Sequence, residues 1–308
     1  MDVNTPTLTI AICTFNRADY LRDTLRDLSI QEADPDRFEI LVINNNSTDH
    51  TAEICDEFAE NNRNLQFRAV NESNQGLSYA RNRAVKEAAG QYLLFIDDDV
   101  ALEIDFVEIA LEQVDHHPDL KCAGGRIFVR FDGADSQPGW IPRELMPMFG
   151  LHDLGNRSIP YPSNNFPRGG NMMIHQTVFE NVGMFDTDLG RIGKELYGSE
   201  EKAFFDRARR ADYKLWYLPD LSLFHRIGPN RLEPDYLKEQ SIGIGKSEYL
   251  RLKSSRMKLA AKFISEIGKL GGSLLLAVGY RLQRRKRAAR FLIQFRLWVL
   301  NGFLSSKK

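Results

Sequence analysis

Three consecutive carboxylates follow a short apolar segment in the first third of the chain. The segment reads Tyr-Leu-Leu-Phe-Ile over residues 92–96, and Asp97, Asp98 and Asp99 come directly after it. Adjacent carboxylates repel one another, so a protein seldom places three together unless a cation or several hydrogen-bond donors offset the charge. We therefore expect a metal site at this point, with a solvated acidic turn as the alternative.

An acidic pair and a histidine in the second half of the chain are further candidates for functional residues. Glu200 and Glu201 open a predicted helix that ends near Arg209 and Arg210. Acidic residues at a helix start and basic residues at its end offset the helix macrodipole, so a purely structural role stays open for this pair. His225 follows an apolar run, where a lone histidine is more often structural than a ligand.

Strand and helix signals alternate in the part of the chain that contains these residues. The apolar segments that predict strands there are 8–13, 38–43, 65–70 and 91–96. Their alternation with helical segments predicts an α/β fold with a mostly parallel, doubly wound sheet flanked by helices. Later strands are expected at 121–131, 168–174, 214–218 and 221–225, and the segment 132–167 is expected to be a long loop.

Polar turns follow several of the predicted strands. They lie at residues 14–17, 44–49 and 97–99. Ligands of open α/β sheets bind beyond the carboxyl ends of the strands, so these turns are expected to form one nucleotide-sized cleft. Asn and Asp are also ordinary turn residues, which keeps a structural interpretation open for each turn alone.

The composition describes a globular protein with an uneven charge. The 308 residues are 43% hydrophobic and 27% charged, which is typical of a large folded core, and the three cysteines show no metal-binding or disulfide spacing. Residues 235–308 carry 17 Lys and Arg against 4 Asp and Glu, whereas residues 1–234 carry 24 against 38. We expect a catalytic domain over 1–234 and a basic, amphipathic helical extension over 235–308.

A basic extension on an acidic body predicts a negatively charged partner. Apolar and aromatic residues at 291–304 lie beside the cluster of basic residues at 281–290, which favours a helix on an anionic membrane surface over a nucleic-acid partner. A helical cap or an oligomer interface is the alternative. The apolar segment at 8–13 is too short for a signal peptide and the one at 269–280 too short to span a bilayer, so we expect a cytoplasmic protein, peripheral on the inner face of the plasma membrane.

Five segments together resemble the family 2 glycosyltransferases, which are inverting enzymes of the GT-A fold. The matching segments occur in the family's order at residues 9–17, 42–49, 74–82, 97–99 and 198–201. The resemblance implies transfer of a sugar from a nucleotide diphosphate sugar to an acceptor hydroxyl with inversion. It also implies a glycan or a lipid-linked acceptor, in cell-surface polysaccharide or glycolipid synthesis.

The resemblance assigns roles to individual residues. It implies that Asp97, Asp99 and His225 hold Mn²⁺ or Mg²⁺, which takes up charge on the leaving diphosphate. Glu201 aligns with the family's catalytic base, and Glu200 is the alternative; the family usually has the shorter Asp at the position of Glu201. The residues implied in binding the nucleotide sugar are Thr14, Asn16, Arg17, Asn44, Asn45, Arg81, Asp97 and Asp98.

The sequence departs from the family at the residues expected to bind the nucleobase. The family often has Asp at the position of Asn44 or Asn45, and amides can donate as well as accept hydrogen bonds. A UDP-sugar is the default donor, and guanosine and thymidine donors stay open.

Other protein classes fit some of the same features. A nucleotidyltransferase would show a Gly-rich loop with Lys or Arg after the first strand, and residues 14–17 lack those glycines. A nucleic-acid binder is supported by the basic extension alone, and no nucleic acid is expected. A donor-binding protein without catalysis is compatible with the unusual acidic pair.

Overall fold

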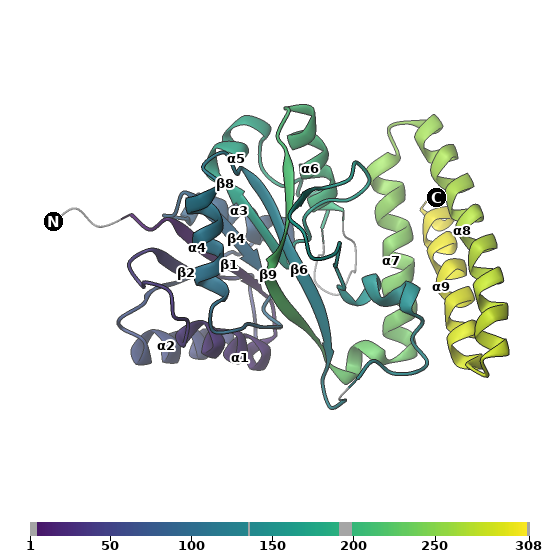
Figure 1. Cartoon of the computed structure of the whole chain (residues 1–308), viewed down its shortest axis with the longest axis horizontal. Coiled ribbons are helices and arrows are strands. Elements are labelled where there is room, and N and C mark those ends of the chain that lie inside the picture. The colour runs from purple at the N-terminus through teal and green to yellow at the C-terminus, as the bar shows by residue number, and fades with distance from the viewer. Residues whose placement is uncertain (1–4, 135, 191–198, 307–308) are drawn as a thin grey trace. The chain divides into compact units, whose positions relative to one another are not determined.

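The computed structural model describes residues 5–134, 136–190 and 199–306, which divide into two compact units. Within these ranges, the sheet unit consists of the residues up to Phe128, Gly150–Thr187 and Glu200–Arg226. The helical unit consists of Val129–Phe149, Ile227–Lys308 and the remaining residues between 188 and 199. Figure 1 shows the strands at the centre of the first unit and the long C-terminal helices of the second.

The described residues form a nine-stranded sheet in the order β3-β2-β1-β4-β8-β6-β9-β5, with β7 paired to β9. The strands are β1 (Leu8–Thr14), β2 (Phe38–Asn44), β3 (Gln66–Asn71), β4 (Tyr92–Ile96), β5 (Val100–Ala101), β6 (Cys122–Phe131), β7 (Ile159–Pro160), β8 (Asn171–His175) and β9 (Leu215–Ile227). Strands β1 to β4 pair in parallel, which confirms the α/β fold expected from the alternating pattern. Strand β8 then runs antiparallel to both β4 and β6.

One continuous strand replaces the two that were expected at 214–218 and 221–225. This strand, β9, runs through Pro219 without a break. Strand β7 pairs with β9 at Trp216 and Tyr217, and β5 pairs with it at Phe224 and His225. Pro219 therefore falls between two short edge strands, where its missing N–H removes no bond of either ladder.

Helices cover both faces of the sheet unit (Figure 1). Leu8, Ile10 and Ile12 of β1 point to one face, and Ala11 points to the other, where Ala80 packs in the second core. The helices of the first face are α1 (Ala18–Ser29), α2 (Thr51–Asn61) and α4 (Phe106–His116). Those of the second face are α3 (Leu77–Glu87), α5 (Gln176–Val182) and α6 (Glu200–Arg210).

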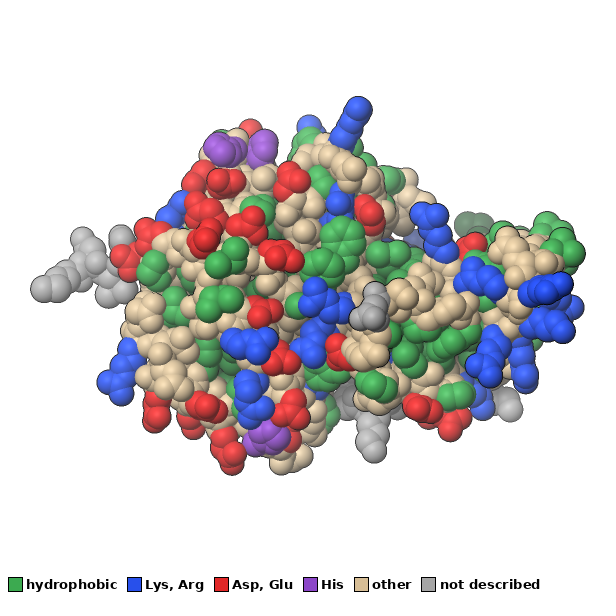
Figure 2. Space-filling view, turned by 60° about the horizontal axis from the view of Figure 1, so that its bottom comes forward, with side chains coloured by type: hydrophobic (Ala, Val, Ile, Leu, Met, Phe, Trp, Pro, Cys, Tyr) green, Lys and Arg blue, Asp and Glu red, His purple; other side chains and the backbone are tan. Residues whose placement is uncertain are grey.

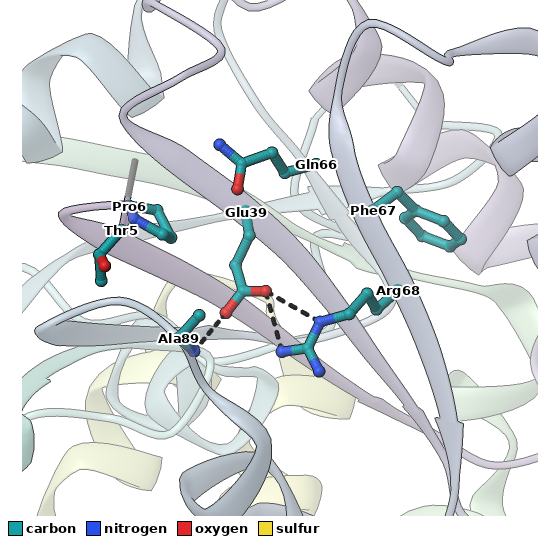
Figure 3. Close-up of a pocket in the computed structure, with 7 residues that line it drawn as sticks. All are labelled: Thr5, Pro6, Glu39, Gln66, Phe67, Arg68 and Ala89. Atoms are coloured by element: carbon teal, nitrogen blue, oxygen red, sulfur yellow. Dashed lines mark hydrogen bonds and ion pairs between the residues drawn. The ribbon is translucent and has the colours of Figure 1, made fainter. Parts of the chain in front are cut away.

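A buried carboxylate joins elements at the amino-terminal end of the strands. Glu39 of β2 accepts hydrogen bonds from Thr9 Oγ1 at 2.6 Å and from the Ala89 N–H at 2.6 Å. Arg68 of β3 donates to its other oxygen at 2.9 and 3.1 Å, and the residues around the pair line a pocket of 320 Å³ (Figure 3). Because the carboxylate is fully satisfied within the chain, we assign it a structural role.

The helical unit is built mainly from three long helices. Its elements are η1 (Arg143–Phe149), η2 (Pro229–Leu232), α7 (Pro234–Leu252), α8 (Arg256–Leu282) and α9 (Lys286–Ser305). Helix α9 packs between α7 and α8. Gly245 of α7 and Gly302 of α9 leave no room for a side chain, because each lies against the backbone of the other helix. Three aromatic residues of α9, Phe291, Phe295 and Phe303, are also buried; Phe291 packs on Trp140 and Phe303 on Tyr249. Among the described residues, no helix has both the length and the apolar content needed to cross a bilayer.

Candidate active site

The polar turns after β1 and β2 are held together by their own side chains. Asn16, in the left-handed region at φ 52°, accepts a hydrogen bond from the Thr48 N–H at 2.7 Å and donates its own N–H to Ser47 Oγ at 3.0 Å. Asp49 accepts the Ala18 N–H at the start of α1 at 3.1 Å. These contacts bring the two turns together at the carboxyl edge of the sheet, as expected from the parallel strands.

The amide side chains of Asn44 and Asn45 hold the same region of backbone. The Asn44 oxygen accepts the Ser47 N–H at 3.0 Å, and the Asn45 oxygen accepts the Gly76 N–H at 2.8 Å. The Asn45 nitrogen donates to the Asn74 carbonyl at 2.7 Å. Both oxygens therefore already accept a backbone hydrogen bond, and contact of these amides with a nucleobase stays a prediction.

Asp98 is buried and fixed from several sides. Its carboxylate accepts a hydrogen bond from Thr14 Oγ1 at 2.7 Å and pairs with Arg17 at 3.1 Å. The Thr24 hydroxyl donates to the Asp98 carbonyl at 2.9 Å, which anchors the acidic turn to α1. Burial raises the pKa of Asp98 to about 6; Arg17 acts against this rise, and neighbouring Asp99 adds to it. Thr14, Arg17 and Asp98 thus lie together, and their binding of a nucleotide sugar stays a prediction.

Asp97, Asp99 and His225 form the candidate metal cluster. One ligand atom from each lies within 4.8 Å of the others. Strand β5, directly after the acidic turn, pairs with β9 so that Val100 stands opposite His225, and this register brings the imidazole Nε2 to 3.3 Å from Asp99 Oδ2. Arg17 pairs with that same oxygen at 2.6 Å. Carboxylates are ligands that Mg²⁺ and Mn²⁺ prefer, so the two aspartates with the imidazole beside them could hold a divalent cation.

Gly150 provides the space that the His225 ring occupies. A Cβ at this glycine would lie 2.6 Å from His225 Nδ1, and the φ of +100° at Gly150 is one that residues with side chains rarely adopt. The two residues lie 75 positions apart in the sequence, so no local pattern predicts their contact. Gly150 is therefore a supporting residue that only the structure identifies.

The acidic pair lies over a buried arginine. Arg81 of α3, 3% exposed, donates to Glu200 Oε1 at 2.7 Å and to Glu201 Oε1 at 3.2 Å. The Glu200 side chain is 2% exposed, whereas that of Glu201 is 21% exposed. The resemblance implies that Arg81 binds the nucleotide sugar; in the structure its partners are the two glutamates, and contact with the donor stays a prediction.

The charges around Glu201 act in opposite directions. Burial raises the pKa of Glu201 above the usual range of a glutamate, and Glu200 and Asp97 add to the rise, while Arg81 and Arg168 lower it. For Arg81 the balance differs: burial lowers its pKa, but the two glutamates raise it more, so the guanidinium is always charged. Glu201 is thus a carboxylate that holds a proton more readily than an exposed glutamate does.

Two adjacent glycines connect the acidic pair to the metal cluster. A Cβ at Gly169 would collide with Arg81 Nη2 and Glu201 Oε1, and a Cβ at Gly170 would lie 2.6 Å from Asp97 Oδ2. The sequence indicates a close backbone approach at this pair of glycines, but it does not reveal what approaches them. The structure therefore places Glu201, the candidate base, and Asp97, one of the candidate metal ligands, against adjacent residues of one backbone segment.

Comparison with known proteins agrees with this geometry. The sequence profile of Glycosyl transferase family 2 matches residues 9–183. A glucosyl-dolichyl phosphate glucuronosyltransferase from Haloferax volcanii is 23% identical over 245 residues, which cover 78% of this chain and 76% of that protein.

Solved structures show the same fold. A mannosyltransferase from Pyrobaculum calidifontis, in complex with GDP-Man and Mn²⁺, superimposes with a TM-score of 0.67 at 16% identity over 98% of this chain and 87% of that one. Residues 1–349 of Staphylococcus aureus TarS, in complex with UDP-GlcNAc, superimpose with a TM-score of 0.52 at 15% identity over 97% of this chain and 92% of that one. These proteins share the GT-A fold. With the family profile matching more than half of its residues, this chain belongs to glycosyl transferase family 2.

Proposed function

We propose that this glycosyltransferase transfers a sugar from a nucleotide diphosphate sugar to an acceptor hydroxyl with inversion and with the help of a divalent cation. One observation carries the proposal: Glu201 of the acidic pair lies against Gly169, and Asp97 of the candidate metal cluster lies against the next residue, Gly170. The diphosphate leaves from, and the acceptor hydroxyl attacks, the same sugar carbon. A cation that stabilises the leaving diphosphate and a base that takes the hydroxyl proton must therefore lie side by side.

Each group of residues at the candidate site has its own proposed role. Asp97, Asp99 and His225 would hold Mn²⁺ or Mg²⁺, which as a Lewis acid offsets charge on the leaving diphosphate. Asp98 would orient the ribose, since Thr14 and Arg17 hold its carboxylate in one position. The turns that contain Asn16, Asn44 and Asn45 would complete the pocket for the nucleoside.

Glu201 is the better candidate for the base. Its side chain is 21% exposed, so an acceptor can reach it, while that of Glu200 is almost completely buried against Arg81. The raised pKa of Glu201 also suits a group that must take a proton in the reaction. Arg81 would then position Glu201 by pairing with its Oε1, and Glu200 would hold Arg81 in place.

Similar proteins suggest the class of donor and the class of acceptor. Two solved neighbours bind GDP-Man and UDP-GlcNAc, so a UDP-sugar stays our default and a GDP-sugar the first alternative. The Haloferax volcanii relative is named for a dolichyl phosphate substrate, which supports a lipid-linked acceptor or a glycan of the cell surface. Thermal unfolding with UDP, GDP and TDP, each with and without Mn²⁺, identifies the nucleobase through the ligand that stabilises most.

A lipid-linked acceptor would require the enzyme at a membrane. We propose that residues 1–234 form the catalytic domain and that 235–308 attach it to the cytoplasmic, anionic surface of the plasma membrane. The charge of the extension, 17 basic against 4 acidic residues, supports this attachment.

Two isosteric variants test the catalytic assignment. Glu201→Gln is expected to abolish transfer while Mn²⁺-dependent binding of the nucleoside diphosphate survives, because the amide cannot accept the proton. Glu200→Gln is expected to keep measurable transfer with a changed pH profile, since this residue acts through its neighbour. Unchanged turnover in Glu201→Gln, or complete loss confined to Glu200→Gln, would overturn the assignment.

A further inference from the structure

Helix α8 presents an apolar stripe to solvent. Met257, Ile264, Leu275 and Leu282 are between 70% and 83% exposed. Their spacings of 7 and 11 residues return to the same side of a helix, because two turns take about 7 residues and three take about 11. Gly268 lies on the same side, and a Cβ there would meet no atom within 4 Å. We call these four large residues the α8 stripe.

The opposite side of α8, which packs within the helical unit, is the more polar one. Its buried residues are Glu266, Ser273, Ala277 and Tyr280. Glu266 pairs there with Lys262 and Lys269, and the Tyr280 hydroxyl donates to Glu144 at 2.7 Å. A helix on the surface of a water-soluble bundle normally has the reverse arrangement, with apolar residues inward. Packing within the described part of the unit therefore does not account for the stripe.

The surroundings of the stripe are strongly basic. From Ser254 to the end, the sequence has 13 Lys and Arg residues and a single acidic residue, Glu266, whose side chain is buried. Figure 2 shows Lys and Arg side chains gathered over the C-terminal helices together with hydrophobic ones. A partner that fits this surface must offer negative charge next to an apolar layer.

Of the possible partners, an anionic bilayer meets both requirements. A second copy of the chain would bring two basic surfaces together, and their like charges would oppose pairing. A nucleic acid supplies phosphates but no apolar layer for four large side chains. A lipid bilayer supplies anionic headgroups directly above acyl chains, and helices with one apolar side and basic flanks lie in that interface.

We propose that α8 lies flat in the headgroup region of an anionic membrane, with the α8 stripe inserted toward the acyl chains. The inference rests on the membrane attachment in the proposed function and identifies the element responsible. The sequence alone predicts attachment through residues 235–308 as a whole, but Phe291, Phe295 and Phe303 of α9 are buried inside the unit. Insertion is thus assigned to the helix before the arginine cluster, and the arginines remain at the headgroups.

Vesicle binding of stripe variants tests the proposal. The double variant Ile264→Ser, Leu275→Ser keeps every charge, and Ile30→Ser, a 57% exposed isoleucine at the end of α1, is the matched control. In sedimentation with vesicles of phosphatidylglycerol and phosphatidylcholine, the double variant is expected to bind about 100-fold more weakly than the wild type, roughly tenfold for each large apolar side chain lost. The control is expected to bind as the wild type does, and neutral phosphatidylcholine vesicles to bind the wild type more weakly.

Insertion itself has a separate readout. A fluorophore such as nitrobenzoxadiazole on Leu275→Cys is expected to brighten and shift to the blue when anionic vesicles are added, whereas the same label on Ile30→Cys is not. Equal vesicle binding by the double variant and the wild type would overturn the proposal. So would stripe-dependent dimers, or salt-sensitive DNA binding, in a protein that does not bind vesicles.

The same variants separate this proposal from the proposed enzymatic function. Transfer to a water-soluble acceptor, measured without vesicles, is expected to be the same in the double variant and the wild type. If the wild type transfers the sugar but does not bind vesicles, only the proposed membrane attachment is overturned. Intact, stripe-dependent vesicle binding without transfer would overturn only the glycosyl-transfer mechanism.

Discussion

Alanine substitutions at Gly169 and Gly170 are expected to impair two different parts of the reaction, although the residues are adjacent. Gly169 lies against Arg81 and Glu201, and Gly170 lies against Asp97. Neither glycine has the positive φ that side chains avoid, so alanine introduces a methyl group without backbone strain. The effect of each substitution is thus the displacement of its neighbour.

For Gly169→Ala, the new Cβ occupies the position of Glu201 Oε1 and Arg81 Nη2, so the proposed base must move. A displacement of about 1 Å at a reacting group costs on the order of 100-fold in rate, and we expect kcat to fall by about that factor. Binding of Mn²⁺ should change little, because the Asp97 side of the segment is untouched.

For Gly170→Ala, the Cβ would lie 2.6 Å from Asp97 Oδ2, where ordinary contacts begin at 3.4 Å. The carboxylate must therefore shift by roughly 0.8 Å, and the half-saturating Mn²⁺ concentration is expected to rise about 10-fold, as for other disturbed ligand supports. At saturating Mn²⁺, kcat should recover most of its value, because the base is not displaced.

Steady-state transfer over a Mn²⁺ titration measures both quantities, and thermal unfolding shows whether each variant is folded. Gly139→Ala is the matched control, since its Cβ would meet no atom within 4 Å. If Gly169→Ala is folded and keeps kcat within twofold, Glu201 does not act from this position. Identical phenotypes for the two variants would refute the division of labour between base and metal.

Three further predictions concern the supports of the site. The kcat/KM of transfer is expected to fall on the acid side at a pH above the usual range of a glutamate, because the base works as a carboxylate and the pKa of Glu201 is raised; Glu200→Gln should move this limb of the pH profile to lower pH. Gly150→Ala is expected to push His225 from its place and to raise the Mn²⁺ requirement about 10-fold, so an unchanged titration would exclude the histidine as a ligand. Glu39→Gln is expected to lower the free energy of unfolding in urea by about 1–3 kcal/mol and to leave kcat unchanged, because its hydrogen bonds lie at the opposite end of the sheet.

The features that the sequence predicts well are those that local patterns determine. The first four strands are short apolar segments followed by polar turns, and each appears in the structure within a residue or two of its expected bounds. The acidic turn falls at the carboxyl end of β4, as expected, because its position depends only on where the apolar run ends. The parallel pairing follows from the helices between these strands.

The features that the sequence does not predict depend on pairing between distant segments. The continuity of β9 through Pro219 depends on which strands lie beside it. The partners of Arg81 lie about 120 residues away on α6, so its role beneath the acidic pair cannot be read from the motif that contains it. The outward direction of the α8 stripe likewise depends on which side of the helix packs on the bundle.

The charge of the site leads to a last prediction. Among the described residues at this edge of the sheet, five carboxylates interact with three guanidinium groups, which leaves an excess of two negative charges. The residues are Asp97, Asp98, Asp99, Glu200 and Glu201, with Arg17, Arg81 and Arg168. A nucleoside diphosphate adds more negative charge, and its repulsion by the carboxylates is relieved only if a divalent cation binds with it.

We therefore expect the affinity for the nucleoside diphosphate to depend on the metal. Calorimetric titration with UDP or GDP should show at least tenfold weaker binding in EDTA than in Mn²⁺. In Asp97→Asn, which removes one negative charge and one ligand, binding in EDTA should strengthen while the enhancement by Mn²⁺ decreases. These opposite changes distinguish electrostatic repulsion from a general loss of the pocket, because a damaged pocket would weaken binding in both conditions. Equal affinity with and without metal in the wild type would show that the aspartate cluster does not face the diphosphate.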